Sequence, residues 1–159
     1  MTPTRAVFDA VVFVQSLANP DGPAAACWRR VLAGELTHFA SDDTLAELAD
    51  VVSRPKVAKR LGFDAEIART FLDAVRRAST VIGDVPARFT YPRDPKDEPL
   101  VNLALAAGAR FLVTWDNDLL DLMKVGDAAG EALTTHAPDL AILTPPEMMR
   151  LLRATIPEP

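Results

Sequence analysis

The chain reads Arg93-Asp94-Pro95-Lys96-Asp97-Glu98-Pro99-Leu100 and continues Val-Asn-Leu-Ala-Leu-Ala-Ala-Gly-Ala-Arg-Phe-Leu-Val-Thr-Trp-Asp116-Asn-Asp118-Leu-Leu. This stretch predicts a helix over about 94–107, because Asp94 is a suitable N-cap, Pro95 suits the first turn and a glycine follows the last apolar residue. The apolar run 110–113 then predicts a strand that ends in an acidic turn. A capped helix, a glycine stop, a short strand and an acidic turn together indicate one half of a site for a hard cation.

Strand-like and helix-like segments alternate along the rest of the chain. The other strands are expected at 6–8, 37–40, 80–82 and 140–143, and the other helices at 24–33, 42–53, 57–61, 64–79 and from a capping box at 144–147 to 152. Residues 11–14 are ambiguous because they are rich in β-branched side chains. Residues 121–139 are expected to be a loop with a short helical turn. Strands separated by helices predict an α/β fold, with an open parallel sheet of about five strands and helices on both faces.

Composition limits the class of protein. The 159 residues are 49% hydrophobic, which favours a single domain over residues 1–159. Because no apolar run is long enough to span a membrane and the N-terminus lacks a signal-peptide core, we expect a cytoplasmic protein without a membrane partner. Cys27 is the single cysteine, and His38 and His136 are far apart in the sequence, so a zinc site is not expected.

The formal net charge of −5 argues against a protein that grips nucleic acid by overall electrostatic attraction, because such proteins usually have a basic excess. It does not exclude a nuclease. Several acids gathered at one metal site would account for most of the negative balance, and bound cations would cancel it locally.

Four acids, Asp9, Glu47, Asp97 and Asp116, lie where a strand or helix meets a turn. In open parallel sheets, ligands bind outside the carboxyl ends of the strands, so we expect the four carboxylates to converge on one pocket there. Asp97, Glu47 and Asp116 each have a structural alternative: a helix N-terminal acid, a solvated helix position and an Asx turn that includes Asp118. Asp9 is harder to explain in this way, because a carboxylate after Ala-Val-Phe is expected to be partly desolvated.

Several carboxylates without basic partners would repel one another, by roughly 3 kcal/mol for a pair about 5 Å apart at an effective dielectric of 20. A hard cation removes this cost. Mg²⁺ and Mn²⁺ prefer oxygen ligands and retain bound water, which suits hydrolysis of a phosphodiester.

The order of these segments resembles the PIN domain family of metal-dependent ribonucleases, which includes toxins of bacterial toxin–antitoxin modules. The resemblance covers nearly the whole chain and depends on Val-Phe-Asp9, on the segment from Ser41 through Glu47 to Lys56, and on the long segment 93–120. It also favours a helix directly after Asp9.

The resemblance implies a function and a set of residues. The family's four catalytic acids fall on Asp9, Glu47, Asp97 and Asp116, and Asp118 matches a frequent fifth acid. The implied metal ligands are Asp9, Asp97, Asp116 and Asp118, and the supporting polar residues are Ser41 and Thr114. The implied activity is RNA cleavage with Mg²⁺ or Mn²⁺, by a protein that is commonly a homodimer and often held by an antitoxin.

One departure from the family pattern leaves an alternative open. The family usually has Thr-Asn after its first acid, whereas this chain has Ala10-Val11, which removes a hydroxyl and an amide beside the metal ligands. The loss of such a supporting group typically costs ~10–100-fold in metal affinity or activity. A catalytically impaired PIN fold that acts as a binding or regulatory module is therefore the second hypothesis.

Two phosphoryl-transfer classes fit less well. A receiver-type phosphoacceptor needs two adjacent acids after the first strand, an acid at the end of the third strand and a downstream lysine, but Asp9 has no acidic neighbour. A haloacid-dehalogenase type needs Asp-x-Asp, where this chain has Asp9-Ala-Val.

RNA contacts are predicted from one basic group near the helix of Glu47, formed by Arg54, Lys56, Lys59 and Arg60. These residues could hold phosphates, or they could form a solvated helix end. Trp115 could stack a base or pack beneath its turn.

Overall fold

Five parallel strands form one open sheet in the computed structural model, which describes residues 2–155. Their order is β3-β2-β1-β4-β5, and each neighbouring pair runs parallel. The strands are β1 (Thr4–Phe8), β2 (Leu36–Ser41), β3 (Ser79–Ile82), β4 (Phe111–Val113) and β5 (Ala141–Leu143). The predicted α/β fold with an open parallel sheet is confirmed, and all five strands overlap the predicted segments.

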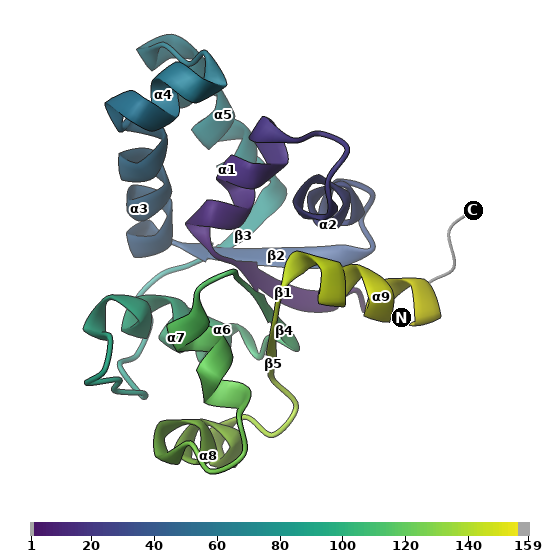
Figure 1. Ribbon diagram of the computed structural model, residues 1–159, viewed down its shortest axis with the longest axis vertical. Coiled ribbons are helices and arrows are strands. Elements are labelled where there is room, and N and C mark those ends of the chain that lie inside the picture. Colours follow the sequence, from purple (N-terminus) through teal and green to yellow (C-terminus); the bar gives the residue numbers. More distant parts are fainter. Residues whose placement is uncertain (1, 156–159) are drawn as a thin grey trace.

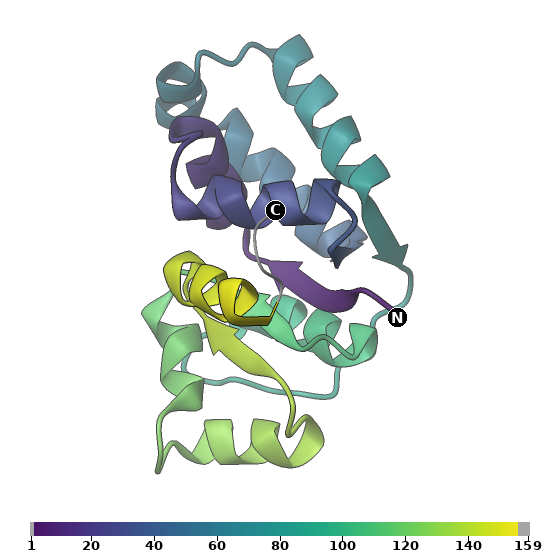
Figure 2. The ribbon, with the colours of Figure 1, turned by 90° about the vertical axis from the view of Figure 1, so that its right-hand side faces the viewer.

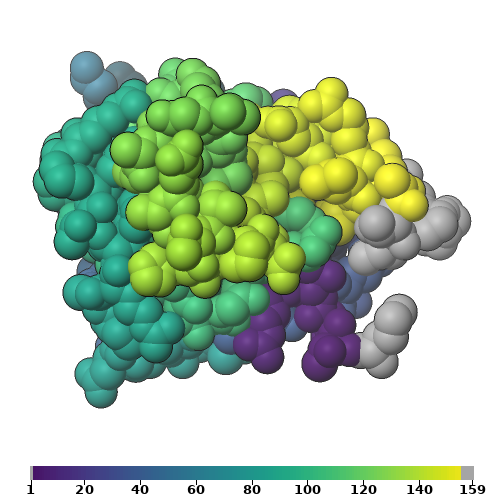
Figure 3. Space-filling model, turned by 90° about the horizontal axis from the view of Figure 1, so that it is seen from below, coloured from purple at the N-terminus to yellow at the C-terminus, as the bar shows by residue number. Residues whose placement is uncertain are grey.

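Helices cover both faces of this sheet (Figures 1 and 2). One face is covered by α1 (Ala10–Ala18), α2 (Pro23–Leu32), α3 (Asp42–Ser53), α5 (Ala65–Ala78) and α9 (Pro145–Thr155), with α4 (Pro55–Leu61) beyond α3. The other face is covered by α6 (Glu98–Ala107), α7 (Asn117–Leu120) and α8 (Ala128–His136). Seen from below, α8 lies in the foreground with α9 to one side (Figure 3).

Successive side chains along each strand point to opposite faces of the sheet, which divides the hydrophobic core into two clusters. Phe8 and Val113 belong to the hydrophobic cluster beneath α1, α2 and α9, whereas Val7 and Leu112 belong to the cluster beneath α6 and α8. This division follows from the period of two of a β-strand, because successive side chains point to opposite faces. The central strands are buried on both faces, as parallel strands usually are.

The backbone after Asp9 is helical, as the resemblance predicted. Helix α1 begins at Ala10 with Asp9 as its N-cap residue, although residues 11–14 are rich in β-branched side chains. Val12 and Phe13 are buried on the inner side of α1. Packing against the sheet therefore outweighs the local strand propensity of this segment.

Two sequence predictions about helices need correction. The helix expected over 94–107 begins as a separate 3₁₀ turn, η1 (Pro95–Asp97), and becomes α-helical from Glu98. The segment 121–139 was expected to be mostly loop, but it contains the 3₁₀ turn η2 (Asp121–Met123) and the nine-residue helix α8. Helix α8 has little periodic signal because it is fixed by a cap and by close packing: Asp127 accepts a hydrogen bond from the Gly130 N–H, and Gly130 lies against Leu122.

The strand order determines where a ligand can bind. From β1 the chain continues to β2 and β3 on one side of the sheet, and then crosses to β4 and β5 on the other side of β1. The direction in which strands are added to the sheet therefore reverses between β1 and β4. Open α/β sheets bind ligands at such a point, beyond the carboxyl ends of the strands. Asp9 directly follows β1, and Asp116 follows β4. Among residues 2–155, none of the helices is long and apolar enough to cross a membrane.

Candidate metal centre

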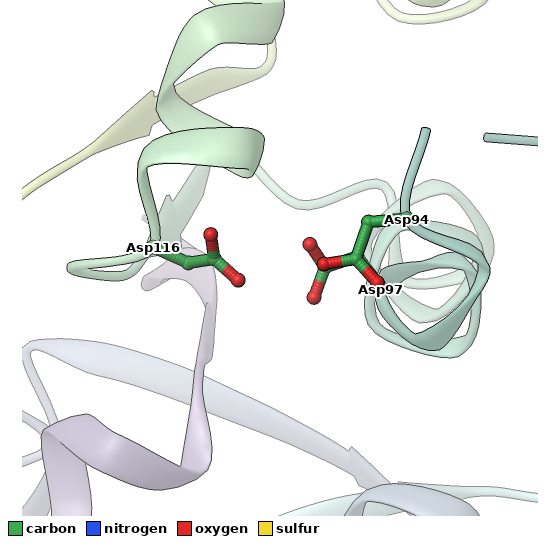
Figure 4. A group of neighbouring side chains, drawn as sticks. All are labelled: Asp94, Asp97 and Asp116. Carbon is green, nitrogen blue, oxygen red and sulfur yellow. The ribbon is translucent and has the colours of Figure 1, made fainter. Parts of the chain in front are cut away.

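Three carboxylates face one another beyond the carboxyl end of β4. Asp94, Asp97 and Asp116 each offer an oxygen, and these oxygens lie within 4.8 Å of one another. Asp116 extends from the turn before α7 toward the other two, which come from the start of η1 (Figure 4). At this separation two ionised carboxylates repel by roughly 3 kcal/mol at an effective dielectric of 20.

Asp97 is the most strongly perturbed member of this group. Its Oδ2 atom is buried and has no hydrogen-bond partner among the described residues. Burial, reinforced by the charges of Asp116 and Asp94, raises the pKa of Asp97 to about 8. A buried carboxylate oxygen without a donor, aimed at two other acids, fits a site whose missing partner is a cation.

Thr114 connects Asp9 to Asp116. The buried Thr114 hydroxyl donates to Asp9 Oδ2 at 2.8 Å and accepts a hydrogen bond from the Asp116 N–H at 2.9 Å. Burial raises the pKa of Asp9, the Thr114 hydrogen bond opposes this rise, and the charge of Asp116 adds to it. One side chain thus fixes the spacing between the acid after β1 and the acid after β4.

Glu47 reaches this region from α3 but is not part of the tight group. It is exposed, and its pKa is raised by partial burial and then by the charge of Asp9. The four acids predicted from the sequence are therefore linked electrostatically in a series, Glu47 to Asp9 and Asp9 to both Asp97 and Asp116.

Asp118, predicted as a further ligand, has a cationic partner. Its carboxylate pairs with Arg93 at 2.8 Å, and its N–H donates to Asp116 Oδ1 at 2.9 Å. Arg93 also pairs with Asp121 at 2.7 Å, and the Tyr91 hydroxyl donates to the Asp118 carbonyl at 2.7 Å. These contacts attach the segment that precedes Asp94 to α7, which holds Asp94 and Asp97 opposite Asp116.

Asp94 was not among the sequence-predicted site residues, because it was interpreted only as a helix cap. Its side chain does accept a hydrogen bond from the Lys96 N–H, at 3.3 Å. The signal that could have identified it is the spacing Asp94-x-x-Asp97, since residues three apart share one side of a helical turn.

Ser41 has a structural role in this state of the protein. Its side chain accepts a hydrogen bond from the Thr44 N–H at 3.1 Å, while its own N–H donates to the Thr44 hydroxyl at 2.9 Å. This reciprocal cap fixes the start of α3 and, through it, the position of Glu47 one turn later.

His38 lies near the site but is held as part of the core. Its ring contacts Phe8, Phe13 and Trp28, its Nε2 accepts a hydrogen bond from the Phe8 N–H at 3.2 Å, and its Nδ1 lies 2.7 Å from the Ser79 hydroxyl. Because that hydroxyl donates to the Val75 carbonyl, Nδ1 carries the proton. Burial lowers the pKa of His38 to about 3, so it stays neutral and adds no cation to the site.

The predicted basic group divides into residues with different surroundings. Arg54 pairs with Asp50 at 2.9 Å across one turn of α3. Arg60 instead lines a cavity that it shares with Trp115. Lys56 and Lys59 are exposed on α4.

The Ala10-Val11 departure has two different consequences. Ala10, the first residue of α1, is buried in the core, whereas Val11 is 44% exposed. An asparagine would therefore be accommodated at position 11 more readily than a larger side chain at position 10.

Comparison with protein families identifies the fold and its class. The family model described as PIN domain matches residues 5–118, which is more than half of the chain. The chain therefore belongs to the PIN domain family. PIN domains are generally nucleases and usually depend on divalent metal ions. A comparison with curated proteins found no match.

Proposed function

We propose that this protein is a metal-dependent endoribonuclease that hydrolyses phosphodiester bonds in RNA. The observation that supports this most strongly is the buried, unpartnered Oδ2 of Asp97 within a group of three acids at the strand reversal of a PIN fold. Ionised carboxylates held this close together repel one another, and a bound cation would remove that cost.

The residues divide by role. Asp94, Asp97 and Asp116 would hold Mg²⁺ or Mn²⁺, and Asp9, oriented by Thr114, would complete the anionic side of the site. A bound metal would activate water and neutralise charge on the leaving oxygen. Glu47 is the candidate proton acceptor, because its raised pKa brings it closer to neutral pH and its side chain is exposed.

The proposal predicts that purified protein cuts single-stranded RNA with Mn²⁺ or Mg²⁺ and stops when a chelator is added. Asp97→Asn should abolish cutting, because the amide keeps the shape of the side chain but removes the charge that binds the cation. It should also raise the melting temperature of the metal-free protein, since an amide removes the cost of burying a charge and the repulsion with Asp116 and Asp94. Cleavage assays and thermal melts with a chelator measure the two effects.

Asp64→Asn is the matched control. Asp64 caps α5 by accepting the Ile67 N–H at 2.8 Å, and asparagine is an equally good cap. This variant should keep activity within a few-fold. Equal cutting by Asp97→Asn and wild type would refute the mechanism.

The impaired binding module is the second candidate, and the surroundings of Ala10 and Val11 support it. Neither side chain offers a polar group where the family usually has a hydroxyl and an amide. If wild type binds metal but cuts no RNA, while Val11→Asn restores cutting, this alternative replaces the first.

We further propose a homodimer and a toxin role with an antitoxin partner, both on the basis of family membership. Light scattering at tens of micromolar should report twice the 17.2 kDa mass of the chain. A monomer at that concentration would contradict the dimer.

A further inference from the structure

A cavity lies at Trp115, the residue that directly precedes Asp116 of the acid group. It has a volume of about 260 Å³, and its lining residues are Trp115, Arg60, Gln15 and Ala18 of α1, the C-cap residue Asn19, and residues 22–24 at the start of α2. Three segments that are distant in the sequence, 15–24, Arg60 and Trp115, thus contribute to one concave surface. None of these residues belongs to the acid group described above.

Trp115 is available for a ligand. Its side chain is 39% exposed, although the residue before it, Thr114, is fully buried. Trp28, the other tryptophan, packs edge-on against Phe8 and Phe13, whereas Trp115 makes no ring contact within the described residues. A large exposed indole in a cavity is a surface on which a flat apolar group can stack.

Arg60 supplies a cation to the same cavity. In contrast to Arg54, which pairs with Asp50, Arg60 has no ion pair or hydrogen bond among residues 2–155. Gln15 and Asn19 add amide groups that can both donate and accept hydrogen bonds. An aromatic face, a guanidinium group and amides match the parts of a nucleotide: base ring, phosphate and base edge.

The cavity is placed for one particular nucleotide. Trp115 directly precedes Asp116, so their Cα atoms are about 3.8 Å apart. Resting on the proposed function, we infer that this cavity binds a single-stranded RNA nucleotide next to the scissile phosphate, with its base stacked on Trp115 and a phosphate on Arg60.

A second concave surface adjoins this cavity at the start of α2. Gly22 and Pro23 also line a neighbouring cavity of about 380 Å³, whose other lining residues include Arg29, Arg150 and Arg153. Arg29 and Arg150 against one acid, Asp21, add basic groups to this neighbouring cavity. The RNA backbone would therefore leave the acid group along the start of α2 toward α9.

Binding of a fluorescein-labelled single-stranded RNA, followed by anisotropy, tests the inference without cleavage. All variants are made in the Asp97→Asn protein and measured with a chelator, so RNA stays intact. Trp115→Ala should weaken binding by about tenfold, because stacking of one base is worth ~1–3 kcal/mol. Arg60→Gln should weaken it and lower the slope of log K against log salt by about 0.7.

Two controls separate a lost contact from a lost fold. Trp115→Phe keeps an aromatic face and should retain most of the affinity. Arg77→Gln removes the same charge from an exposed position on α5 and should leave both affinity and salt slope unchanged.

The outcomes also separate this inference from the proposed function. Weakened RNA binding by Trp115→Ala and Arg60→Gln, together with a wild-type protein that cuts no RNA with Mn²⁺ or Mg²⁺, would support the subsite and contradict the ribonuclease. If both variants bind RNA as tightly as the Asp97→Asn parent, or if that parent binds no single-stranded RNA, the subsite is refuted even where wild type cuts.

Discussion

Thr114 is the residue on which the geometry of the acid group most depends. Its hydroxyl serves Asp9 and the backbone of Asp116 at once, and it is fully buried. Replacement by valine keeps the shape of the side chain but removes both hydrogen bonds.

Thr114→Val should reduce activity by about 10–100-fold, because Asp9 loses the group that orients it. It should lower the free energy of unfolding by about 1–3 kcal/mol, since the partly buried Asp116 N–H loses its hydrogen-bond partner. The Thr114 hydrogen bond lowers the pKa of Asp9, so its loss raises that pKa further, and the rise of activity with pH should move to higher pH. Thr114→Ser keeps the hydroxyl and should behave like wild type. Rate–pH profiles that coincide for the valine variant and wild type would contradict this role.

At the residue scale, the sequence predicted Asp9, Glu47, Asp97 and Asp116 as one site, and the structure links these four electrostatically. Their catalytic role stays a prediction. Asp94 was missed because the sequence alone does not distinguish an aspartate that caps a helix from one that binds a metal ion. The pairing of Asp118 with Arg93 was missed because it depends on how the segment before η1 docks on α7.

Among the elements, the pair η2 and α8 depends on tertiary contact more than on local sequence. A Cβ atom on Gly130 would lie 2.0 Å from the Leu122 carbonyl oxygen, closer than any real contact allows. The glycine therefore permits α8 to approach η2.

Gly130→Ala should destabilise the protein by about 1–3 kcal/mol, even though alanine is the better helix former, because the backbone of Leu122 or α8 must shift. Urea denaturation would measure the change in midpoint. Gly83→Ala is the matched control, because a Cβ at Gly83 meets nothing within 4 Å. A Gly130→Ala variant as stable as wild type would show that the approach of α8 to η2 is not needed.

Elements with strong local signals were predicted well. Asp64 caps α5, and Thr144 and Glu147 form the reciprocal cap that starts α9, as the sequence indicated. Helix α8 was missed because its defining contact is with η2, and the 3₁₀ geometry of η1 was missed because the same residues could begin an α-helix directly.

For the whole molecule, alternation of strands and helices was sufficient to predict the sheet, because parallel strands with crossover helices have few possible arrangements. The sequence predicted that Asp9 and Asp116 follow carboxyl ends of strands, but not the strand order that places β1 beside β4. The cavity of Trp115 and Arg60 did not follow, because it is assembled from segments whose approach only the folded chain shows.

The central claim is that Asp94, Asp97 and Asp116 together hold a divalent cation, and it can be tested by locating that cation. Crystals soaked in Mn²⁺ would be measured for anomalous scattering. The account predicts one strong peak within ligand distance, about 2.0–2.3 Å, of oxygens from all three acids, and no such peak in Asp97→Asn crystals. A wild-type peak elsewhere, or none at saturating Mn²⁺, would contradict it.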